Sequence, residues 1–498
     1  MSFEYVVVQA GGRGSRMGTL TANKPKALVT VDNLPIIFHL FKKYPDKKFI
    51  IIGDYKSDVL EKYLSAFATV DHVVVKCNGS TGTCAGISEA LTLIPEKKSF
   101  MLIWSDIVLS DSLEIPEATD IIGISDRFVC RWQYSEGRFY EKTACGHGVA
   151  GVFVFSDKSR LDNIPESGEF VRWLSQSNLS FEEFNLENTM EFGTPDAFRN
   201  NNKRCRPFNR ITVEGDKLYK VPQDELGTLL SENEINWYKK ASALGVTNIP
   251  QIYSFSPLCM EYINGRNVYE LSDFSKEEKS LVLGKIISSL KKLHSLEVFP
   301  ADCDSYYKAY IEKTFQRLEK VRQLVPYADQ KSITINGRKC RNVFFVKDEL
   351  ISKVMSYIPA EFAFIHGDCT FSNIIIDSKN EPVFIDPRGY FGECKLYGDP
   401  AYDWVKLYYS VFSNYDRFNL GKYSLEIEEE IRIEVESNGW EDLESIFFEL
   451  VGSEISKEHM MLLLSVVWLS LTTYAWNDYD AVCAAFYLGI YYLEEALK

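Results

Sequence analysis

The sequence predicts an α/β protein in two parts, an N-terminal doubly wound mixed sheet and a C-terminal α+β domain with two lobes. The first observation is that apolar runs of strand length alternate with helical patterns from residue 1 to about 200. The second is a polar, basic stretch at 199–207, which is typical of a domain boundary. The third is a pair of short apolar strands at 374–377 and 383–385, joined by a turn. With 498 residues, the chain exceeds the size of a single core.

Composition and charge limit the partners. Hydrophobic residues make up 46% and charged residues 25% of the chain, as is usual for globular proteins in water. The net charge of −15 disfavours nucleic acid and anionic membranes as general partners. There is no basic N-terminal region and no apolar run of membrane-spanning length, and the 11 cysteines form no Cys-x-x-Cys pair. We therefore expect a cytoplasmic protein without a membrane anchor, zinc site or disulfide framework. The sequence leaves a homo-oligomer open.

The first predicted strand, 5–10, leads directly into a glycine-rich loop at 11–18. Glycines let the backbone approach a phosphate closely, and a helix start after them adds N–H donors. Arg16 and Lys26 supply positive charge, and Pro25 fixes the backbone before Lys26. The spacing is neither that of a Walker loop nor that of a Rossmann fingerprint. We expect a nucleotide to bind at Ala10, Gly11, Gly12, Arg13, Gly14 and Ser15.

Further strands are predicted at 49–53, 73–75 and 100–104, with helices at 59–67 and from 83 to 93. In a doubly wound sheet, ligands bind at the carboxyl ends of the strands. Gly82 and Thr83, in a loop at 79–83, and Asp106 follow such ends. We therefore predict that Gly82 and Thr83 contact the nucleotide and that Asp106 binds a metal ion. The alternative for Asp106 is a helix N-cap or turn residue.

Residues 1 to about 200 resemble the superfamily of sugar-phosphate and phosphocholine nucleotidylyltransferases. The motifs that carry the resemblance are the loop 9–16, the Lys-Pro-Lys sequence at 24–26, Asp106, the lysine of 140–142, and 191–196. The resemblance implies a GT-A-like, Rossmann-type fold. It also implies attack of a phosphate oxygen on the α-phosphorus of a nucleoside triphosphate, with release of pyrophosphate.

The same resemblance implies a role for each matching residue. Arg16 and Lys26 would stabilise the leaving pyrophosphate, and Lys142 would bind the substrate phosphate. Asp106 and Glu191 would hold Mg²⁺. The family has an aspartate at the position of Glu191, so this ligand is one methylene longer here.

The boundary is placed between residues 200 and 201. After it, 208–221 is predicted as a hairpin with a Gly-Asp turn, and 229–243 as a helix. Phosphoryl transfer from ATP uses a lysine on the nucleotide phosphates that is held by a glutamate on the next helix. Lys220 and Glu234 are the predicted pair, and a solvated lysine and glutamate are the alternative. Backbone groups from Glu261 to Ile263 are expected to reach the nucleotide base.

The most informative stretch is 364–377, followed by 383–386. Four residues separate Asp368 from Asn373, and Asp386 ends the second strand. Phosphoryl transfer needs a carboxylate to orient the acceptor hydroxyl and oxygen ligands to hold Mg²⁺. The Asp-x-x-x-x-Asn spacing with a downstream Asp is that of a kinase catalytic loop. Asp368 is therefore predicted as the catalytic base, with Asn373 and Asp386 as Mg²⁺ ligands. Ordinary turn residues are the alternative.

Residues from about 207 to 498 resemble the aminoglycoside phosphotransferase and choline kinase superfamily, a branch of the protein-kinase-like fold. The resemblance rests on His-Gly-Asp at 366–368, Asn373, Ile-Asp at 385–386, and 397–403. It implies an N-terminal lobe at 201–265 and a C-terminal lobe at 266–498. Asp403 is expected to orient the catalytic loop. Arg388 is interpreted either as a contact to a phosphate or anionic substrate or as an outward-facing charge.

In the C-terminal lobe we predict helices over 275–330 and again from about Ser424 onwards. His294 is predicted to have a structural role. Late aromatic residues are interpreted as helical core and surface, and the alternative is a cage for a quaternary amine. Asp478 and Asp480 are alternative contacts to sugar hydroxyls. The aromatic residues are Trp468, Tyr474, Trp476 and Tyr479.

Together the two parts predict a bifunctional enzyme that uses Mg²⁺, ATP and a second triphosphate, with CTP favoured. One part would phosphorylate a sugar, polyol or amino alcohol, and the other would transfer a nucleotidyl group to that phosphate for a surface glycan precursor. One alternative is a choline kinase joined to a CTP:phosphocholine cytidylyltransferase. A second is one catalytic domain with a degenerate regulatory module. A nucleotidylyltransferase acting on nucleic acid is disfavoured by the acidic charge.

Overall fold

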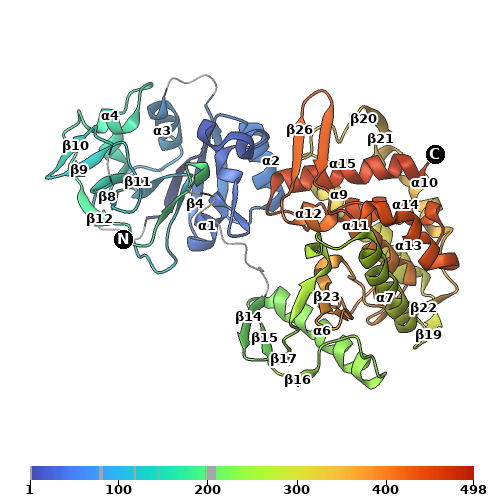
Figure 1. Cartoon of the computed structure of the whole chain (residues 1–498). Helices are drawn as coiled ribbons and strands as arrows, with labels where there is room; N and C mark the ends of the chain where they lie inside the picture. The colour runs from blue at the N-terminus through green and yellow to red at the C-terminus, as the bar shows by residue number, and fades with distance from the viewer. Residues whose placement is uncertain (1–2, 78–81, 117–118, 144, 197, 199–208) are drawn as a thin grey trace. The chain divides into compact units, whose positions relative to one another are not determined.

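The computed structural model describes residues 3–77, 82–116, 119–143, 145–196, 198 and 209–498. The chain forms two compact units. Unit 1 contains 1–205 together with Trp476–Asp480, and unit 2 contains 206–475 and 481–498 (Figure 1). The predicted boundary stretch 199–207 lies outside the described residues, so its position between residues 200 and 201 stays a prediction.

Unit 1 is built on a nine-stranded mixed sheet in the order β10-β9-β11-β6-β1-β4-β5, with β8 against β11 and β12 against β8. The parallel centre is β6-β1-β4-β5, and β11 joins it antiparallel to β6. This arrangement confirms the predicted mixed α/β sheet. The strands are β1 (Tyr5–Gln9), β4 (Lys48–Gly53), β5 (His72–Lys76), β6 (Phe100–Trp104), β8 (Ile121–Ser125), β9 (Gln133–Ser135), β10 (Arg138–Tyr140), β11 (Gly148–Phe155) and β12 (Glu182–Asn185).

Helices and short pairings complete unit 1. The apolar run of β1 is buried throughout Val6, Val7 and Val8, as expected for a central parallel strand covered on both faces. Two-stranded pairings join β2 to β3 and β7 to β13. The remaining elements are α1 (Ile36–Lys43), α2 (Ser57–Phe67), α3 (Thr83–Leu91), α4 (Phe170–Leu174), β2 (Thr30–Val31), β3 (Leu34–Pro35), β7 (Ile107–Val108) and β13 (Met190–Glu191).

One segment from late in the sequence, Trp476–Asp480, belongs to unit 1. The ring of Trp476 packs against Phe38 at 5.3 Å between centroids. Lys24 forms ion pairs with Asp478 and Asp480 at 2.5 and 2.9 Å. These contacts assign Trp476, Asp478 and Asp480 to the packing of unit 1. Trp468 and Tyr479 are buried on helices, and Tyr474 is exposed, in line with the interpretation of the late aromatic residues as core and surface.

Unit 2 begins with a four-stranded antiparallel sheet in the order β14-β15-β17-β16, beside α6 (Glu225–Ala243) (Figure 1). The strands β14 (Asn209–Glu214) and β15 (Lys217–Pro222) turn at Gly215 and Asp216, which confirms the predicted hairpin. Asp224 caps α6 by accepting a hydrogen bond from the Gly227 N–H at 2.6 Å. The other two strands are β16 (Ile252–Phe255) and β17 (Leu258–Glu261).

The larger, helical part of unit 2 surrounds two small sheets, β18-β23-β24 and β19-β22-β25. Its helices are α7 (Lys276–His294), α8 (Cys303–Tyr307), α9 (Lys313–Val321), α10 (Lys347–Met355), α11 (Pro400–Val411), α12 (Tyr415–Asn419), α13 (Glu444–Val451), α14 (Lys457–Leu471) and α15 (Tyr479–Ala496). Its strands are β18 (Gly265–Asn267), β19 (Val298–Pro300), β22 (Glu361–Phe364), β23 (Ile374–Asp377), β24 (Pro382–Phe384) and β25 (Tyr397–Gly398).

The structure corrects two predictions of secondary structure. The region after Ser424 is a hairpin of β26 (Tyr423–Ile427) and β27 (Ile431–Val435), which joins β20 (Ser332–Ile335) and β21 (Arg338–Arg341) in one sheet. Leu425, Ile427, Ile431 and Ile433 recur with a period of two, which favours a strand over a helix. The predicted helical stretch 275–330 is interrupted by β19, and Leu281 is 63% exposed rather than buried in the helix face. In the part of the chain that the structure describes, no helix is both long and apolar enough to span a bilayer.

Candidate active sites

The His-Gly-Asp loop of unit 2 follows the buried strand β22 and is held by Asp403 of α11. The Asp403 carboxylate is fully buried and accepts hydrogen bonds from the His366 and Gly367 N–H groups at 2.8 and 2.7 Å. His294 Nε2 lies 2.9 Å from the same carboxylate. Burial raises the pKa of Asp403, but the hydrogen bond from His294 and the backbone donors outweigh it and lower the pKa overall. Asp403 therefore orients the loop as a charged acceptor, and His294 has the structural position that was predicted.

Asp368 and Asn373 are directly joined. Asn373 Nδ2 donates to Asp368 Oδ2 at 3.1 Å and to the Asp368 backbone oxygen at 2.8 Å. The amide nitrogen is thereby committed to Asp368. Lys406 of α11 lies 2.8 Å from Asp368 Oδ1. Lys406 was not predicted, although it stands three residues after Asp403 on the same helix and so on a neighbouring face.

Asp386 follows β24 and forms an ion pair with Lys220 of β15, in the four-stranded sheet at the start of unit 2. Lys220 Nζ lies 2.6 Å from Glu234 Oε2 and 2.9 Å from Asp386 Oδ1. Burial lowers the pKa of Lys220, but Asp386 and Glu234 outweigh it and raise the pKa. The Ile385 N–H donates to the Asn373 carbonyl at 2.9 Å, so the two predicted metal ligands stand on paired backbone segments. The structure thus brings Asp368, Asn373, Asp386 and Lys220 to one place.

These residues fit a magnesium ion by their donor chemistry. Mg²⁺ prefers oxygen ligands such as carboxylates, with water filling the remaining positions. Asn373 uses its amide nitrogen for the hydrogen bond to Asp368, so its side-chain oxygen is the atom that would bind the ion. Asp386 supplies a carboxylate beside it. Asn373 and Asp386 would hold the ion, and the ion would neutralise charge on the triphosphate.

Two of the backbone N–H groups in the stretch predicted to contact the nucleotide base are hydrogen-bonded within the protein. The Glu261 N–H donates to the Gln251 carbonyl at 2.8 Å, and the Tyr262 N–H donates to the Asp216 carbonyl at 2.8 Å. Among the described residues no hydrogen bond is recorded for the Ile263 N–H. The Glu261 N–H is therefore engaged within the protein, and the contacts of Glu261 and Ile263 to a base stay predictions.

In unit 1 the predicted site centres on Lys26, Asp106 and Glu191. Lys26 Nζ lies 2.5 Å from Asp106 Oδ2, and both residues are largely buried. The Phe192 N–H donates to the Asp106 carbonyl at 2.9 Å, which fixes Glu191 beside β7. Burial and the charge of Asp106 raise the pKa of Glu191, against the opposing influence of Lys26 and Arg16.

Two features of this carboxylate pair fit a divalent cation. Asp106 Oδ1 is buried and has no hydrogen-bond partner among the residues that the structure describes. The negative charge of Asp106 disfavours the ionised form of Glu191, and a cation bound by both carboxylates would remove that repulsion. Asp106 and Glu191 would therefore hold Mg²⁺. No cluster of three or more His, Cys, Asp or Glu residues suited to a metal was found within the described ranges.

The glycine loop of unit 1 lies against the same residues. Gly14 has a φ of +63°, and a Cβ there would stand 3.3 Å from Lys26 Cβ. A Cβ on Gly11 would stand 2.9 Å from Asp54 Cβ, so a larger residue would displace the loop. Ala10 is buried at the end of β1, whereas the exposed side chain of Arg13 lies over the Tyr55 ring at 5.5 Å. Gly12 and Ser15 are exposed on this loop.

Three further predicted contacts of unit 1, Gly82, Thr83 and Lys142, are exposed. Gly82 begins α3 with a φ of +102° and packs against Gly168, where a Cβ would meet the carbonyl at 2.3 Å. Thr83 Oγ1 accepts a hydrogen bond from the Phe170 N–H at 2.8 Å. Lys142 is exposed after β10, and no ion pair of its side chain is found within the described chain. Gly79 of the predicted loop lies outside the described residues. The roles of Gly82, Thr83 and Lys142 therefore stay predictions.

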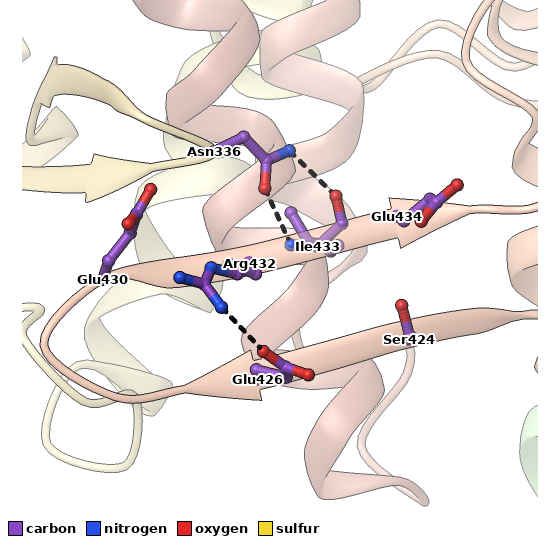
Figure 2. A pocket seen from close by; sticks show the side chains of 7 residues that line it. All are labelled: Asn336, Ser424, Glu426, Glu430, Arg432, Ile433 and Glu434. Carbon is purple, nitrogen blue, oxygen red and sulfur yellow. Dashed lines mark hydrogen bonds and ion pairs between the residues drawn. The ribbon is translucent and has the colours of Figure 1, made fainter.

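A recess on the β26–β27 hairpin carries none of the predicted residues (Figure 2). The Asn336 side chain donates to the Ile433 carbonyl at 2.8 Å and accepts from the Ile433 N–H at 2.9 Å. The remaining lining of the recess is mainly acidic, with Glu426, Glu430 and Glu434. Asp368, Asn373, Asp386 and Lys220 are not among its lining residues.

Comparison with known proteins agrees with this division. Residues 6–161 match the model of the MobA-like NTP transferase domain, and residues 208–424 match the model of the phosphotransferase enzyme family. The N-terminal half of the chain thus resembles the NTP transferase family, and the C-terminal half resembles the phosphotransferase enzyme family. Both are transferase families that act on phosphorus-containing groups, and members of such families use nucleoside triphosphates and Mg²⁺. The predicted relationship of both halves is confirmed.

Individual relatives cover different parts of the chain. A UTP–glucose-1-phosphate uridylyltransferase, AglF, of Haloferax volcanii is 29% identical over 118 residues, which is 22% of this chain and 45% of the relative. A protein of Bacillus subtilis named as a probable glucose-1-phosphate cytidylyltransferase is 22% identical and covers 43% of this chain and 98% of its own length. The chain spans less than half the length of several of the curated relatives it matches.

One of the solved structures to which the chain is similar is the complex of gentamicin with APH(2″)-IIa. It is 15% identical, covers 57% of this chain and 87% of that chain, and gives a TM-score of 0.38.

Proposed function

We propose that this chain is a bifunctional enzyme, in which unit 2 phosphorylates a small alcohol with ATP and unit 1 transfers a nucleotidyl group to the resulting phosphate. The observation that carries the proposal is that each unit gathers its own set of cationic and oxygen-bearing side chains. Lys220, Asp386 and Asp368 form one set, and Lys26 and Asp106 form the other. A shared phosphorylated intermediate explains why the two domains occupy one chain.

In unit 2, the acceptor hydroxyl attacks the γ-phosphorus of ATP and ADP leaves. Asp368 orients the hydroxyl and accepts its proton. Lys220, held by Glu234 at 2.6 Å, binds the nucleotide phosphates. Asn373 and Asp386 hold Mg²⁺. The backbone at Ile263 contacts the base.

In unit 1, a phosphate oxygen of the acceptor attacks the α-phosphorus of a triphosphate and pyrophosphate leaves. The loop from Ala10 to Ser15 approaches the triphosphate, and Arg16 and Lys26 stabilise the leaving group. Asp106 and Glu191 hold Mg²⁺. We propose CTP as the triphosphate, since cytidylyltransferases occur among the relatives. The product is then an activated precursor for a surface glycan, and Lys142 would bind the acceptor phosphate.

Separate loss of the two activities tests the proposal. Asp368→Asn should abolish ADP release by the full chain and leave pyrophosphate release from a supplied phosphorylated acceptor unchanged. Asp106→Asn should do the reverse. If Asp368→Asn leaves ADP release intact, the kinase assignment is wrong. If only one of the two substitutions has an effect, one unit is a non-catalytic module that regulates the other.

A further inference from the structure

Four cationic side chains surround the catalytic loop of unit 2, from segments far apart in the sequence. Lys313 and Arg317 stand one turn apart on α9 and so share a face of the helix. Arg388 follows Asp386 in the loop after β24, and Lys406 lies on α11. The labels α9 and α11 show the two helices that contribute three of these residues (Figure 1).

Tyrosine rings hold the cluster together. Arg388 Nη1 donates to the Tyr402 hydroxyl at 2.6 Å, and Lys313 Nζ lies 5.8 Å from the centre of the same ring. Arg388 also stacks over Tyr390 at 4.4 Å and donates to its hydroxyl at 2.8 Å. These contacts fix the positions of the cations without neutralising them.

The cluster also borders the catalytic loop directly. A Cβ on Gly367 would stand 2.9 Å from Arg388 Cβ, so Arg388 packs on the backbone just before Asp368. The Arg388 N–H donates to the His366 carbonyl at 2.9 Å. Lys406 lies 2.8 Å from Asp368 itself. The cations therefore stand where a bound acceptor would present its hydroxyl.

The positive charge of the cluster is not balanced by nearby carboxylates. Among the described residues, Lys313, Arg317 and Arg388 have no ion pair with a carboxylate, and Arg317 donates to the Ser470 carbonyl. Asp368 is the carboxylate that acts on Lys313, Lys406 and Arg388. Burial, followed by the charges of Arg388, Arg317 and Lys406, holds the pKa of Lys313 well below its usual value.

Four cations that face one carboxylate repel one another, so the cluster carries a local excess of positive charge in a chain whose net charge is −15. Like charges that are partly buried repel and cost stability unless a counter-ion meets them. A quaternary amine or aminoglycoside would add another positive charge here, whereas an anionic group would remove the repulsion. Arginine and lysine beside tyrosine hydroxyls are also suited to phosphate and carboxylate oxygens.

We propose that the acceptor of unit 2 is an alcohol that already carries an anionic group, a phosphate or a carboxylate, bound by Lys313, Arg317 and Arg388. The proposal rests on the kinase activity proposed for unit 2. The acceptor hydroxyl oxygen bonds to the γ-phosphorus while the bond from that phosphorus to the β–γ bridging oxygen breaks. ADP leaves, and the hydroxyl proton passes to Asp368. The anionic group is unchanged, and the product carries a new phosphate for unit 1.

The first experiment measures ADP release by the full chain with matched acceptors, in the presence of Mg²⁺ and ATP. The sets are glycerol, glycerate and glycerol 3-phosphate, and glucose, glucuronate and glucose 6-phosphate, with choline and ethanolamine as cationic alcohols. We expect kcat/KM for an anionic member to exceed that for its neutral partner by ~100-fold, since contacts to charged groups are strong. The ratio of kcat/KM for the phosphate-bearing acceptor to kcat/KM for the carboxylate-bearing acceptor of each set identifies which anion is recognised. A preference for choline, ethanolamine or a neutral member would overturn the proposal.

The second experiment measures binding without turnover. Inorganic phosphate and acetate are titrated into the full chain saturated with Mg²⁺ and a non-hydrolysable ATP analogue, so that the nucleotide phosphates are already in place. Lys313→Met and Arg317→Met should weaken binding of the preferred anion by ~10-fold or more and leave the affinity for the ATP analogue unchanged. Lys320→Met, an exposed lysine on the same helix, is the control and should change neither affinity.

The outcomes separate this proposal from the proposed function. Weaker binding of the ATP analogue in Lys313→Met would place the cluster on the nucleotide and overturn the anionic acceptor. Absence of anion binding to the wild-type chain would overturn it whatever the kinase assay shows. Loss of ADP release for every acceptor, together with normal anion binding, would instead contradict the kinase activity. If a variant does not fold, the matched acceptors and wild-type binding decide the question.

Discussion

At the scale of single residues, Asp403 is the side chain on which the catalytic loop depends. It accepts the His366 and Gly367 N–H groups and contacts His294, all at 2.7 to 2.9 Å and without exposure to water. A buried charge with several donors is strongly destabilised when one of its oxygens is changed. Asp403 therefore acts as a positioning residue for Asp368.

Asp403→Asn tests this role. One carboxylate oxygen becomes an amide donor that faces N–H groups, so we expect a loss of about 1–3 kcal/mol in the free energy of unfolding. We also expect a lower kcat for ADP release, because the loop that carries Asp368 shifts. Denaturant unfolding and steady-state kinetics measure the two effects. Asp329→Asn, at an exposed position, should change neither, and an unaltered kcat in Asp403→Asn would contradict the role.

A second residue-scale prediction concerns pH. His459 of α14 is buried, stacks on Tyr357 at 4.1 Å, and burial lowers its pKa to about 4. In the unfolded chain its pKa is about 6.5, so as the pH falls below that value the unfolded state binds the proton first. Stability from this residue is therefore present above pH ~6.5 and is lost as the pH falls towards 4.

His459→Phe keeps the stacked ring and removes the titration. Between pH 7 and pH 5 the wild-type chain should lose about 2 kcal/mol more stability than the variant, from the difference between the two pKa values. Chemical denaturation of both proteins at the two pH values provides the comparison. Equal losses would show that His459 does not carry this dependence.

At the scale of elements, α11 links the fold of unit 2 to its chemistry. It carries both Asp403 and Lys406, and its N-cap is Asp399, followed by Pro400. Asp399 accepts hydrogen bonds from the Ala401 N–H at 3.0 Å and from the Tyr310 hydroxyl at 2.9 Å. Burial raises the pKa of Asp399 to about 6.

Asp399→Ala removes this cap. We expect a loss of about 1–2 kcal/mol in stability, and a lower kcat for ADP release because the start of α11 loosens. Ser275→Ala is the matched control, since Ser275 caps α7 through the Glu278 N–H at 3.2 Å. It should cost a similar amount of stability and leave kcat unchanged. An equal effect of the two substitutions on kcat would show that the start of α11 has no particular influence on ADP release.

Elements also show where sequence patterns are ambiguous. The hairpin of β14 and β15 was predictable because Gly215 and Asp216 separate two strand-like runs. The hairpin of β26 and β27 was not predicted, because the acidic residues between its apolar positions also fit an amphipathic helix. Its pairing with β20, through Ile335 and Ile431, is a long-range contact that no local pattern contains.

At the scale of the whole molecule, the two units carry separate sets of site residues. A ligand that binds only the folded form of one unit stabilises that unit by an amount set by its concentration and affinity. The described contacts place Asn373, Asp386 and Lys220 within unit 2, and Lys26 and Asp106 within unit 1. Nucleotides should therefore act on the units selectively.

Calorimetric unfolding tests this selectivity. A non-hydrolysable ATP analogue with Mg²⁺, at 100 times its dissociation constant, should stabilise unit 2 by about 2.7 kcal/mol. Asp386→Asn should remove that stabilisation and leave unaltered any effect of CTP with Mg²⁺ on unit 1. A shift by the ATP analogue that survives Asp386→Asn would show that the nucleotide binds elsewhere.

The sequence by itself determined the mixed sheet of unit 1, the β14–β15 hairpin and the strands β23 and β24 of unit 2, and the resemblance of each half to a transferase family. A motif with a short spacing, such as Asp368 to Asn373, can be recognised from the sequence alone. Residues a few positions apart on one loop must lie close together in the fold. The structure brings Asp368, Asn373 and Asp386 together and joins Lys26 to Asp106, and their roles stay predictions.

Only the tertiary structure decided the rest. It brought Lys313 of α9 to the same tyrosine, Tyr402, as Arg388. It also placed Trp476–Asp480 in unit 1. The physical reason is that these relations join residues tens to hundreds of positions apart, and such pairings depend on the packing of whole elements rather than on local propensity.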